Sequence, residues 1–138
     1  MIAVVDIDGV LADPSHRQHH LNSRPKNWDG FFASVSDDEL IERGRTMVEE
    51  LAAEHEIVLL SGRPERTRAD TEAWLAEHGI RYARLVLRDD DDHRPAGWMK
   101  ADLIRRIGAP EEVALVVDDE PKVVATLTRR GYTVRRFV

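Results

Sequence analysis

The chain contains no cysteine, which removes several kinds of chemistry from consideration. Disulfides, thiolate nucleophiles and cysteine-based zinc sites are all excluded. Long apolar runs are missing as well, since none approaches the roughly 20 residues that a membrane-spanning helix needs. The amino terminus also lacks the basic and then apolar pattern of a signal peptide. We therefore expect a cytoplasmic location and no membrane partner.

An excess of positive charge is absent too. Lysine and arginine number 20 against 26 acidic residues, which gives a net charge of −6 at pH 7. This balance argues against broad, sequence-independent binding of nucleic acid, which depends on neutralising phosphates, although net charge does not describe local patches. The hydrophobic fraction of 42% and the charged fraction of 33% are ordinary for a globular protein. From a length of 138 residues we expect one domain, spanning 1–138.

Short apolar runs alternate with helical patterns along the chain. Strands are expected at Ile2–Val5, Ile57–Leu60, Leu85–Leu87, Val113–Val117 and within Tyr132–Val138. Helices are expected from Asp37 or Asp38 to about Glu54, from about Glu65 to His78, over Trp98–Ile107, and from Pro121 to about Arg130. Such alternation is typical of a parallel sheet with crossover helices. The sequence therefore predicts an α/β fold with a central parallel sheet of about five strands, the first strand lying centrally.

Two carboxylates, Asp6 and Asp8, follow the first predicted strand with one residue between them. Alternate residues of an extended chain share a face, so both acids should point to one spot. Burying two like charges is costly unless a cation or a shared proton offsets them. The same pattern occurs in ordinary turns and in calcium loops. A calcium loop needs further oxygen ligands where this chain has the apolar run from Val10 to Ala12, so the turn and a catalytic metal site are the two readings that stay open.

Two more polar clusters follow predicted strands. Ser61 to Pro64 comes after the second strand, and Asp118 with Asp119 comes after the fourth. The carboxyl ends of parallel strands meet at the edge of the sheet where ligands bind, so we expect these clusters to lie beside Asp6 and Asp8. Each has a simpler reading: a loop with a helix cap for the first, and a cap for the helix that Pro121 begins for the second.

Taken together, the motifs resemble those of the haloacid dehalogenase-like superfamily. The matching stretches, in order, are Asp6 to Leu11, Ser61 to Arg63, Lys100, and Val116 to Asp119. A set of motifs at the expected strand ends is more specific than any one of them. The resemblance implies a three-layer, Rossmann-like phosphohydrolase.

The resemblance also implies a role for each matched residue. Asp6 would be the nucleophile that forms an aspartyl-phosphate, and Asp8 the general acid and base, which needs a raised pKa. Ser61, the Gly62 amide at a helix start, and Lys100 would bind the phosphate. Mg²⁺ would be held by Asp6, by the backbone carbonyl of Asp8, and by Asp118 or Asp119.

A closer likeness is to the phosphatase domain of bacteriophage-type polynucleotide kinase-phosphatase. Arg17 and Arg63 match arginines of that domain, which makes them candidates for contacts with the substrate, and Arg88 and Arg94 match it loosely. The chain has no Gly-x-x-x-x-Gly-Lys-Ser/Thr loop, so 5′-kinase activity is not expected. The intervals between motifs are short and leave no room for a large cap domain. An open site admits the end of a polymer, so we expect removal of a terminal phosphate from DNA or RNA.

Other interpretations stay open at this point. The substrate could instead be a free nucleotide or another small phosphomonoester, or the chain could be a phosphate-binding module without catalysis. Between Asp13 and Ser36 the pattern is least regular. There we expect Trp28, Phe31 and Phe32 to belong to the core, with stacking of Trp28 on a base as the alternative. His16, His19 and His20 could share a helical turn as a transition-metal site.

Overall fold

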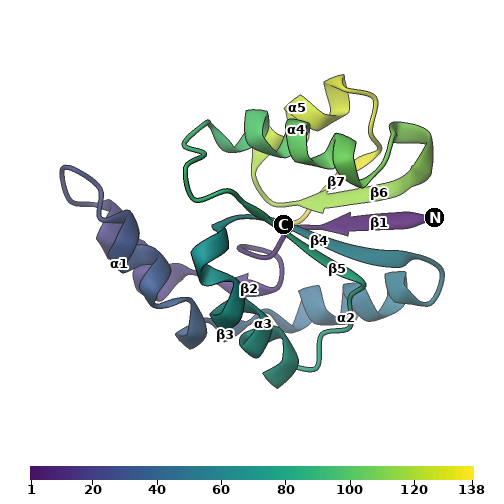
Figure 1. The fold of residues 1–138 in the computed structure, drawn as a ribbon. Helices are drawn as coiled ribbons and strands as arrows, with labels where there is room; N and C mark the ends of the chain where they lie inside the picture. The colour runs from purple at the N-terminus through teal and green to yellow at the C-terminus, as the bar shows by residue number, and fades with distance from the viewer.

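The computed structural model describes residues 1–138 and contains a five-stranded parallel sheet in the order β5-β4-β1-β6-β7 (Figure 1). The strands are β1 (Ile2–Val5), β4 (Glu56–Pro64), β5 (Arg84–Arg88), β6 (Val113–Asp118) and β7 (Val134–Arg136). The predicted α/β fold, the number of strands and the central place of the first strand are confirmed. Because β4 and β5 lie on one side of β1 and β6 and β7 on the other, the strand order reverses at β1, where α/β folds place their ligands.

Helices cover both faces of this sheet, as Figure 1 shows. One face carries α2 (Glu42–Ala52) and α3 (Arg68–Glu77), and the other carries α4 (Ala96–Ile107) and α5 (Pro121–Arg129). The pleat of β1 serves both layers, since Val5 packs in the core beneath α2 and α3 while Val4 packs beneath α4 and α5. This explains why the strands read as continuous apolar runs rather than alternating ones. No helix has both the length and the apolar character that crossing a membrane requires.

Helix ends agree with the expected positions to within a few residues, with one informative exception. Gly79 and Gly131 adopt φ values of 68° and 94° just after α3 and α5, as expected for helix-terminating glycines. The exception is α2, which begins at Glu42 and not at Asp37 or Asp38. Asp38 cannot cap it because its side chain is buried in contacts with two arginines. The chain instead makes a short strand, β3 (Glu39–Leu40), paired with β2 (Ala12–Asp13), before the helix starts.

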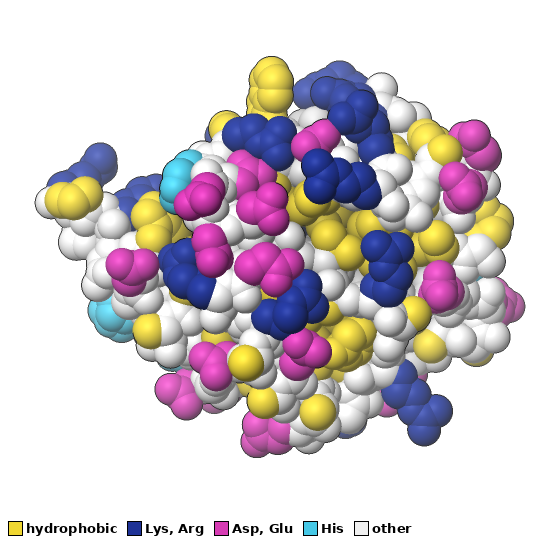
Figure 2. Space-filling view, viewed as in Figure 1, with side chains coloured by type: hydrophobic (Ala, Val, Ile, Leu, Met, Phe, Trp, Pro, Cys, Tyr) yellow, Lys and Arg dark blue, Asp and Glu magenta, His cyan; other side chains and the backbone are white.

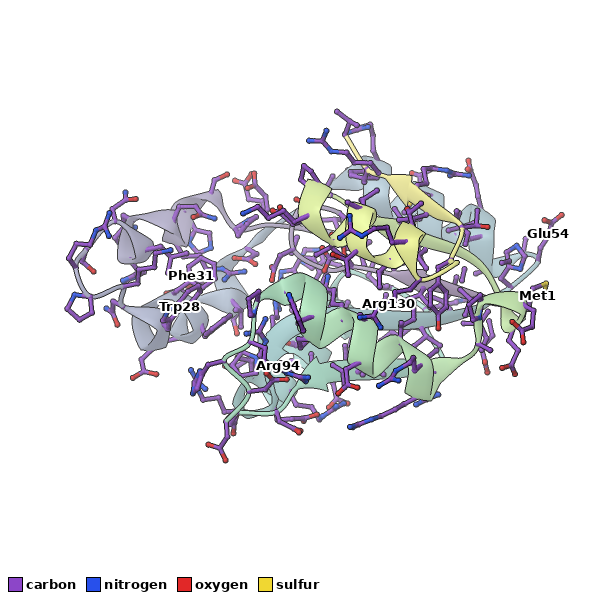
Figure 3. All side chains as sticks on the ribbon, turned by 90° about the horizontal axis from the view of Figure 1, so that it is seen from above. Met1, Trp28, Phe31, Glu54, Arg94 and Arg130 are labelled. Carbon is purple, nitrogen blue, oxygen red and sulfur yellow. The ribbon has the colours of Figure 1, made fainter.

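The irregular stretch before α2 folds as a small helical projection. It consists of a 3₁₀ turn at Ser15–Leu21 and the short helix α1 (Trp28–Ala33), which protrudes beside the sheet in Figure 1. Figure 3 shows Trp28 and Phe31 together at the opposite end of the molecule from Met1. No large cap domain is present, as predicted. The expectation that Trp28 belongs to the core is wrong, since 48% of it is exposed, whereas Phe31 is buried.

Candidate active site

The polar clusters predicted from the sequence meet at the carboxyl edge of the sheet. Asp6 directly follows β1, Ser61 lies in the carboxyl half of β4, and Asp118 is the last residue of β6; these strands are neighbours, and all three residues are buried. Lys100 reaches this place from α4 and is also buried. Four ionisable or hydroxyl side chains gathered in one buried place are costly to hold there unless they serve one another.

Lys100 links two of the acids. Its Nζ donates a hydrogen bond to Asp118 Oδ2 at 2.6 Å and lies 3.0 Å from Asp6 Oδ1. Burial alone would lower the pKa of Lys100, but the attraction of Asp6 and Asp118 more than offsets it and raises that pKa. Lys100 is therefore a fixed positive charge, suited to electrostatic stabilisation and not to proton transfer.

Three carboxylates form a cluster that fits a divalent cation. Asp6, Asp118 and Asp119 each place an oxygen within 4.8 Å of the others, and no second group of this kind occurs in the chain. The alternative site at His16, His19 and His20 is therefore not supported. Burial raises the pKa of Asp6; Lys100 opposes this shift, while the neighbouring acids reinforce it.

Charge balance supports the same conclusion. The site holds five carboxylates against three basic side chains: Asp6, Asp8, Asp38, Asp118 and Asp119 against Arg17, Arg63 and Lys100. The carboxylates therefore outnumber the basic side chains, which favours a cation at the site. Because the cluster offers oxygen ligands only, a hard cation such as Mg²⁺ suits it. The residues present therefore fit the predicted cofactor.

Gly9 explains how the chain passes so close to this cluster. It adopts a φ of 83°, in the left-handed region that favours glycine. A Cβ atom at this position would lie 1.9 Å from Asp119 Oδ2. Asp119 can therefore approach the Asp6 loop only because residue 9 has no side chain. The N-cap residue of α5 is Glu120, whose side chain accepts from the Lys122 amide, while Asp118 Oδ1 accepts the amide hydrogen of Glu120 just before the helix.

Two buried arginines hold Asp8. Arg17 Nη2 donates to Asp8 Oδ1 at 2.8 Å, and Arg63 donates to both Asp8 oxygens, at 2.9 Å and 3.2 Å. Neither arginine has exposed surface. The structure thus brings both predicted substrate-contacting residues into the site, but it turns their donors toward Asp8.

Asp38 completes this network, although it was not predicted from the sequence as a site residue. It accepts from Arg17 Nε at 2.8 Å and Nη2 at 2.7 Å, and from Arg63 Nη2 at 3.0 Å. His16 Nε2 lies 2.6 Å from the Asp38 carboxylate, and the backbone carbonyl of Asp38 accepts a hydrogen bond from Trp74 Nε1. One signal was available: two arginines expected in a buried site need more counter-charge than Asp8 alone provides. Nothing in the sequence indicates which of the many acids supplies it.

The raised pKa expected for Asp8 is wrong for this structure. Burial does favour the neutral acid, but the charges and hydrogen bonds of Arg63 and Arg17 outweigh it, so the pKa of Asp8 is lowered. The raised pKa belongs to its neighbour Asp6. In the free protein the two arginines therefore hold Asp8 as an anion.

The phosphate-binding loop predicted from the sequence, Ser61 to Pro64, forms the last four residues of β4, and Ser61 and Gly62 supply neutral donors there. Ser61 Oγ accepts the Arg63 amide hydrogen at 3.1 Å, which leaves the Ser61 hydroxyl proton available for a ligand. The sequence predicted Gly62 at the start of a helix, and this is wrong. Gly62 lies within β4, and α3 begins only at Arg68. Arg88 flanks this loop: its Nη2 would be 3.5 Å from a Cβ placed at Gly62.

The comparison with protein families identifies this arrangement. A family model described as the polynucleotide kinase PNKP phosphatase domain matches residues 1–137. The chain belongs to this family. It is therefore a phosphatase domain of the haloacid dehalogenase type, as the motifs predicted. No curated protein matches the chain.

Solved structures show the same fold. Chains from two structures of the Pnkp1/Rnl/Hen1 complex, one described as an RNA repair complex, are each 24% identical and match 99% of this chain, with TM-scores of 0.79 and 0.83. This chain covers 45% and 42% of them, less than half of their length. A haloacid dehalogenase family enzyme from Bacteroides thetaiotaomicron, in complex with magnesium and inorganic phosphate, is 12% identical with a TM-score of 0.63 over 98% of this chain and 92% of its own. At these identities the likeness shows the fold alone.

Proposed function

We propose that this phosphatase domain removes the 3′-terminal phosphate from DNA or RNA strands, with Mg²⁺ as cofactor and an aspartyl-phosphate on Asp6 as the intermediate. The observation that carries the proposal is the pairing of two unlike carboxylates. Asp6 lies beside Lys100 in the acidic cluster, and Asp8, two residues further along the chain, accepts hydrogen bonds from two arginines. A module that only binds phosphate needs no such second acid. The PNKP phosphatase family and the absence of a large cap support a polymer end as substrate.

In the first step the Asp6 carboxylate attacks the phosphorus atom. The bond from Asp6 oxygen to phosphorus forms, the bond from phosphorus to the 3′ oxygen breaks, and Asp8 gives its proton to that oxygen. Ser61, the Gly62 amide and Lys100 would hold the non-bridging oxygens. Asp6, the Asp8 carbonyl, and Asp118 or Asp119 would hold Mg²⁺, which when bound would reduce the repulsion between the anionic nucleophile and the phosphate.

Asp8 must be protonated for this step, although its pKa is lowered in the free protein. A dianionic phosphate at Ser61 adds negative charge beside Asp8 and attracts the same arginine donors. Both effects raise the pKa of Asp8, so the bound substrate itself favours the acid form.

In the second step a water molecule hydrolyses the intermediate. Asp8 accepts a proton from the water while the water oxygen forms a bond to phosphorus. The bond between phosphorus and the Asp6 oxygen breaks, and inorganic phosphate leaves. Asp8 is then protonated again, and Asp6 is restored as a carboxylate.

Arg17 and Arg63 act in this scheme mainly through Asp8. The hydrogen bonds of Arg17 go to Asp8, Asp38 and the Phe31 carbonyl. Arg63 also donates to Thr71. We propose that they aim Asp8 at the leaving oxygen. Direct contact of either arginine with the substrate stays a prediction, and it requires Asp8 to release a donor.

The test compares four substrates in the presence of Mg²⁺. Phosphate release is measured from a 3′-phosphorylated oligonucleotide, its 5′-phosphorylated twin, and free 3′- and 5′-nucleotides, with Asp6→Asn as the blank. The proposal predicts Asp6-dependent release that is fastest from the 3′-phosphorylated strand. Preference for a free nucleotide would move the substrate to small phosphomonoesters, and preference for the 5′ twin would contradict the end specificity.

A further inference from the structure

A cavity of about 340 Å³ opens beside the phosphate-binding loop. Gly62 is part of its wall, together with Trp28 and Phe32 from α1 and with Arg66 and Arg88 from the segments around β4 and β5. Its volume falls in the range of roughly 300–1,000 Å³ that is usual for small-molecule sites. Because Gly62 is shared, a ligand whose phosphate lies at Ser61 can place its next group in this cavity.

Building on the proposed function, we propose that this cavity binds the terminal nucleobase of the strand, which stacks on Trp28. The mechanism above gives no role to this tryptophan. Trp28 is 48% exposed, so without a ligand much of its aromatic surface is in contact with water.

The aromatic ring is held for stacking. Trp28 lies nearly parallel to Phe32, with centroids 5.9 Å apart and an angle of 19° between the rings, and it meets Phe31 edge-on at 5.9 Å. Phe31 is buried, and the Arg17 guanidinium lies over its ring at 4.3 Å. The wall that would receive the base is thereby connected to the Asp8 network. A rigid aromatic face loses little entropy when a base stacks on it.

The charges around the cavity favour a neutral ligand over a second phosphate. Arg66 lies 3.3 Å from Asp29, and its amide donates to Asp90 at 2.9 Å. Asp92, also in the wall, accepts from Arg94 at 2.8 Å. Figure 2 shows acidic and basic side chains interspersed over the visible face. Apart from Arg88, which forms no ion pair, these charged side chains have partners of opposite charge, so the cavity offers many donors and acceptors to the edge of a base.

One donor is unused. Arg88 Nε is buried without a hydrogen-bond partner, although Arg88 Nη1 donates to the Asp92 carbonyl at 3.3 Å. A buried donor without a partner is costly, so a ligand atom that accepts from it gains affinity. Arg88 lies against Gly62, between the phosphate loop and the cavity, where an acceptor on the terminal sugar or base would arrive.

The test uses two 3′-phosphorylated oligonucleotides that differ only in the terminal residue, which is a normal nucleoside in one and an abasic sugar in the other. Trp28→Ala should raise KM for the normal strand roughly 5- to 150-fold, the worth of one stacked base, and leave the abasic strand unchanged. Trp28→Tyr should restore most of the preference. Trp98→Ala is the matched control, because Trp98 is 67% exposed on α4, away from this cavity.

Binding gives a second measurement that does not need turnover. In Asp6→Asn protein, the normal strand should quench tryptophan fluorescence more than the abasic strand, and Trp28→Phe should remove the difference. If the wild type removes the 3′ phosphate but Trp28→Ala keeps the full preference for the normal strand, the stacking site is wrong and the proposed function stands. If the wild type releases no phosphate from either strand, the proposed function fails, and equal quenching by the two strands then overturns the stacking site as well.

Discussion

Replacing Asp38 by asparagine tests the buried network most directly. The variant keeps the shape of the side chain but removes the negative charge of Asp38, which pairs with Arg17 and Arg63. The same two arginines also pair with Asp8. Breaking one side of a buried ion pair costs about 3–5 kcal/mol. Because Asp8 still faces both arginines, we expect a loss near the lower limit, about 3 kcal/mol of the free energy of unfolding.

Activity should fall as well, because the arginines would no longer aim Asp8 correctly. A displacement of about 1 Å at a reacting group costs roughly 100-fold in rate. We therefore expect kcat on the 3′-phosphorylated strand to fall about 100-fold, with a much smaller change in KM, since Asp38 makes no hydrogen bond or ion pair with Ser61, Gly62 or Lys100, the groups proposed to bind the phosphate.

The assay combines urea unfolding, followed by far-ultraviolet circular dichroism, with phosphate release. Asp37→Asn is the matched control: this acid is adjacent in sequence but exposed, so its replacement should change the free energy of unfolding by less than about 0.5 kcal/mol. If Asp38→Asn unfolds and turns over like Asp37→Asn, the argument that Asp38 positions Asp8 is refuted.

Three further predictions concern the phosphate and metal site. Asp119→Asn should raise the Mg²⁺ concentration needed for half-maximal phosphate release, and an unchanged Mg²⁺ titration would count against its place in the cluster. Gly9→Ala should lose more stability than Gly79→Ala in urea unfolding: both glycines have positive φ, worth about 1–2 kcal/mol, but only the first would collide with a carboxylate. Lys100→Met should lower kcat at least roughly 100-fold because it leaves two carboxylates without their shared cation, whereas exposed Lys122→Met should not, as initial rates would show.

The elements of the fold were largely predictable because their signals are local. The runs at Ile2–Val5 and Val113–Val117 are apolar enough to be buried on both faces, and Gly79, Gly108 and Gly131 follow the helices before them. The predicted start of α2 was wrong because a contact distant in sequence determines the position of Asp38. An aspartate before an amphipathic run suits a helix cap, but Asp38 gains more from two buried arginines than from the end of a helix.

The candidate site divides in the same way. Asp6, Ser61, Lys100 and Asp118 converge because each lies near, or faces, the carboxyl end of a strand in a parallel sheet. The order of strands and helices already implies that edge. The raised pKa expected for Asp8 was wrong because it was argued from burial and a neighbouring acid alone, without the two guanidinium groups that reverse its direction.

The amino-acid sequence by itself determined the alternation of strands and helices, the motifs at the strand ends, and hence the family and the chemistry of its phosphatase site. The strands and helices follow from apolar periodicity and turn residues, which act within about ten positions along the chain, and the family and its chemistry follow from the resemblance of the motifs. Only the tertiary structure decided that Asp38 shares the arginines of Asp8, that these arginines are buried, and that Trp28 is exposed and lines the same cavity as Gly62. Arg17 and Asp38 are 21 positions apart and Arg63 and Asp8 are 55 apart, so their pairing depends on packing that no local pattern records.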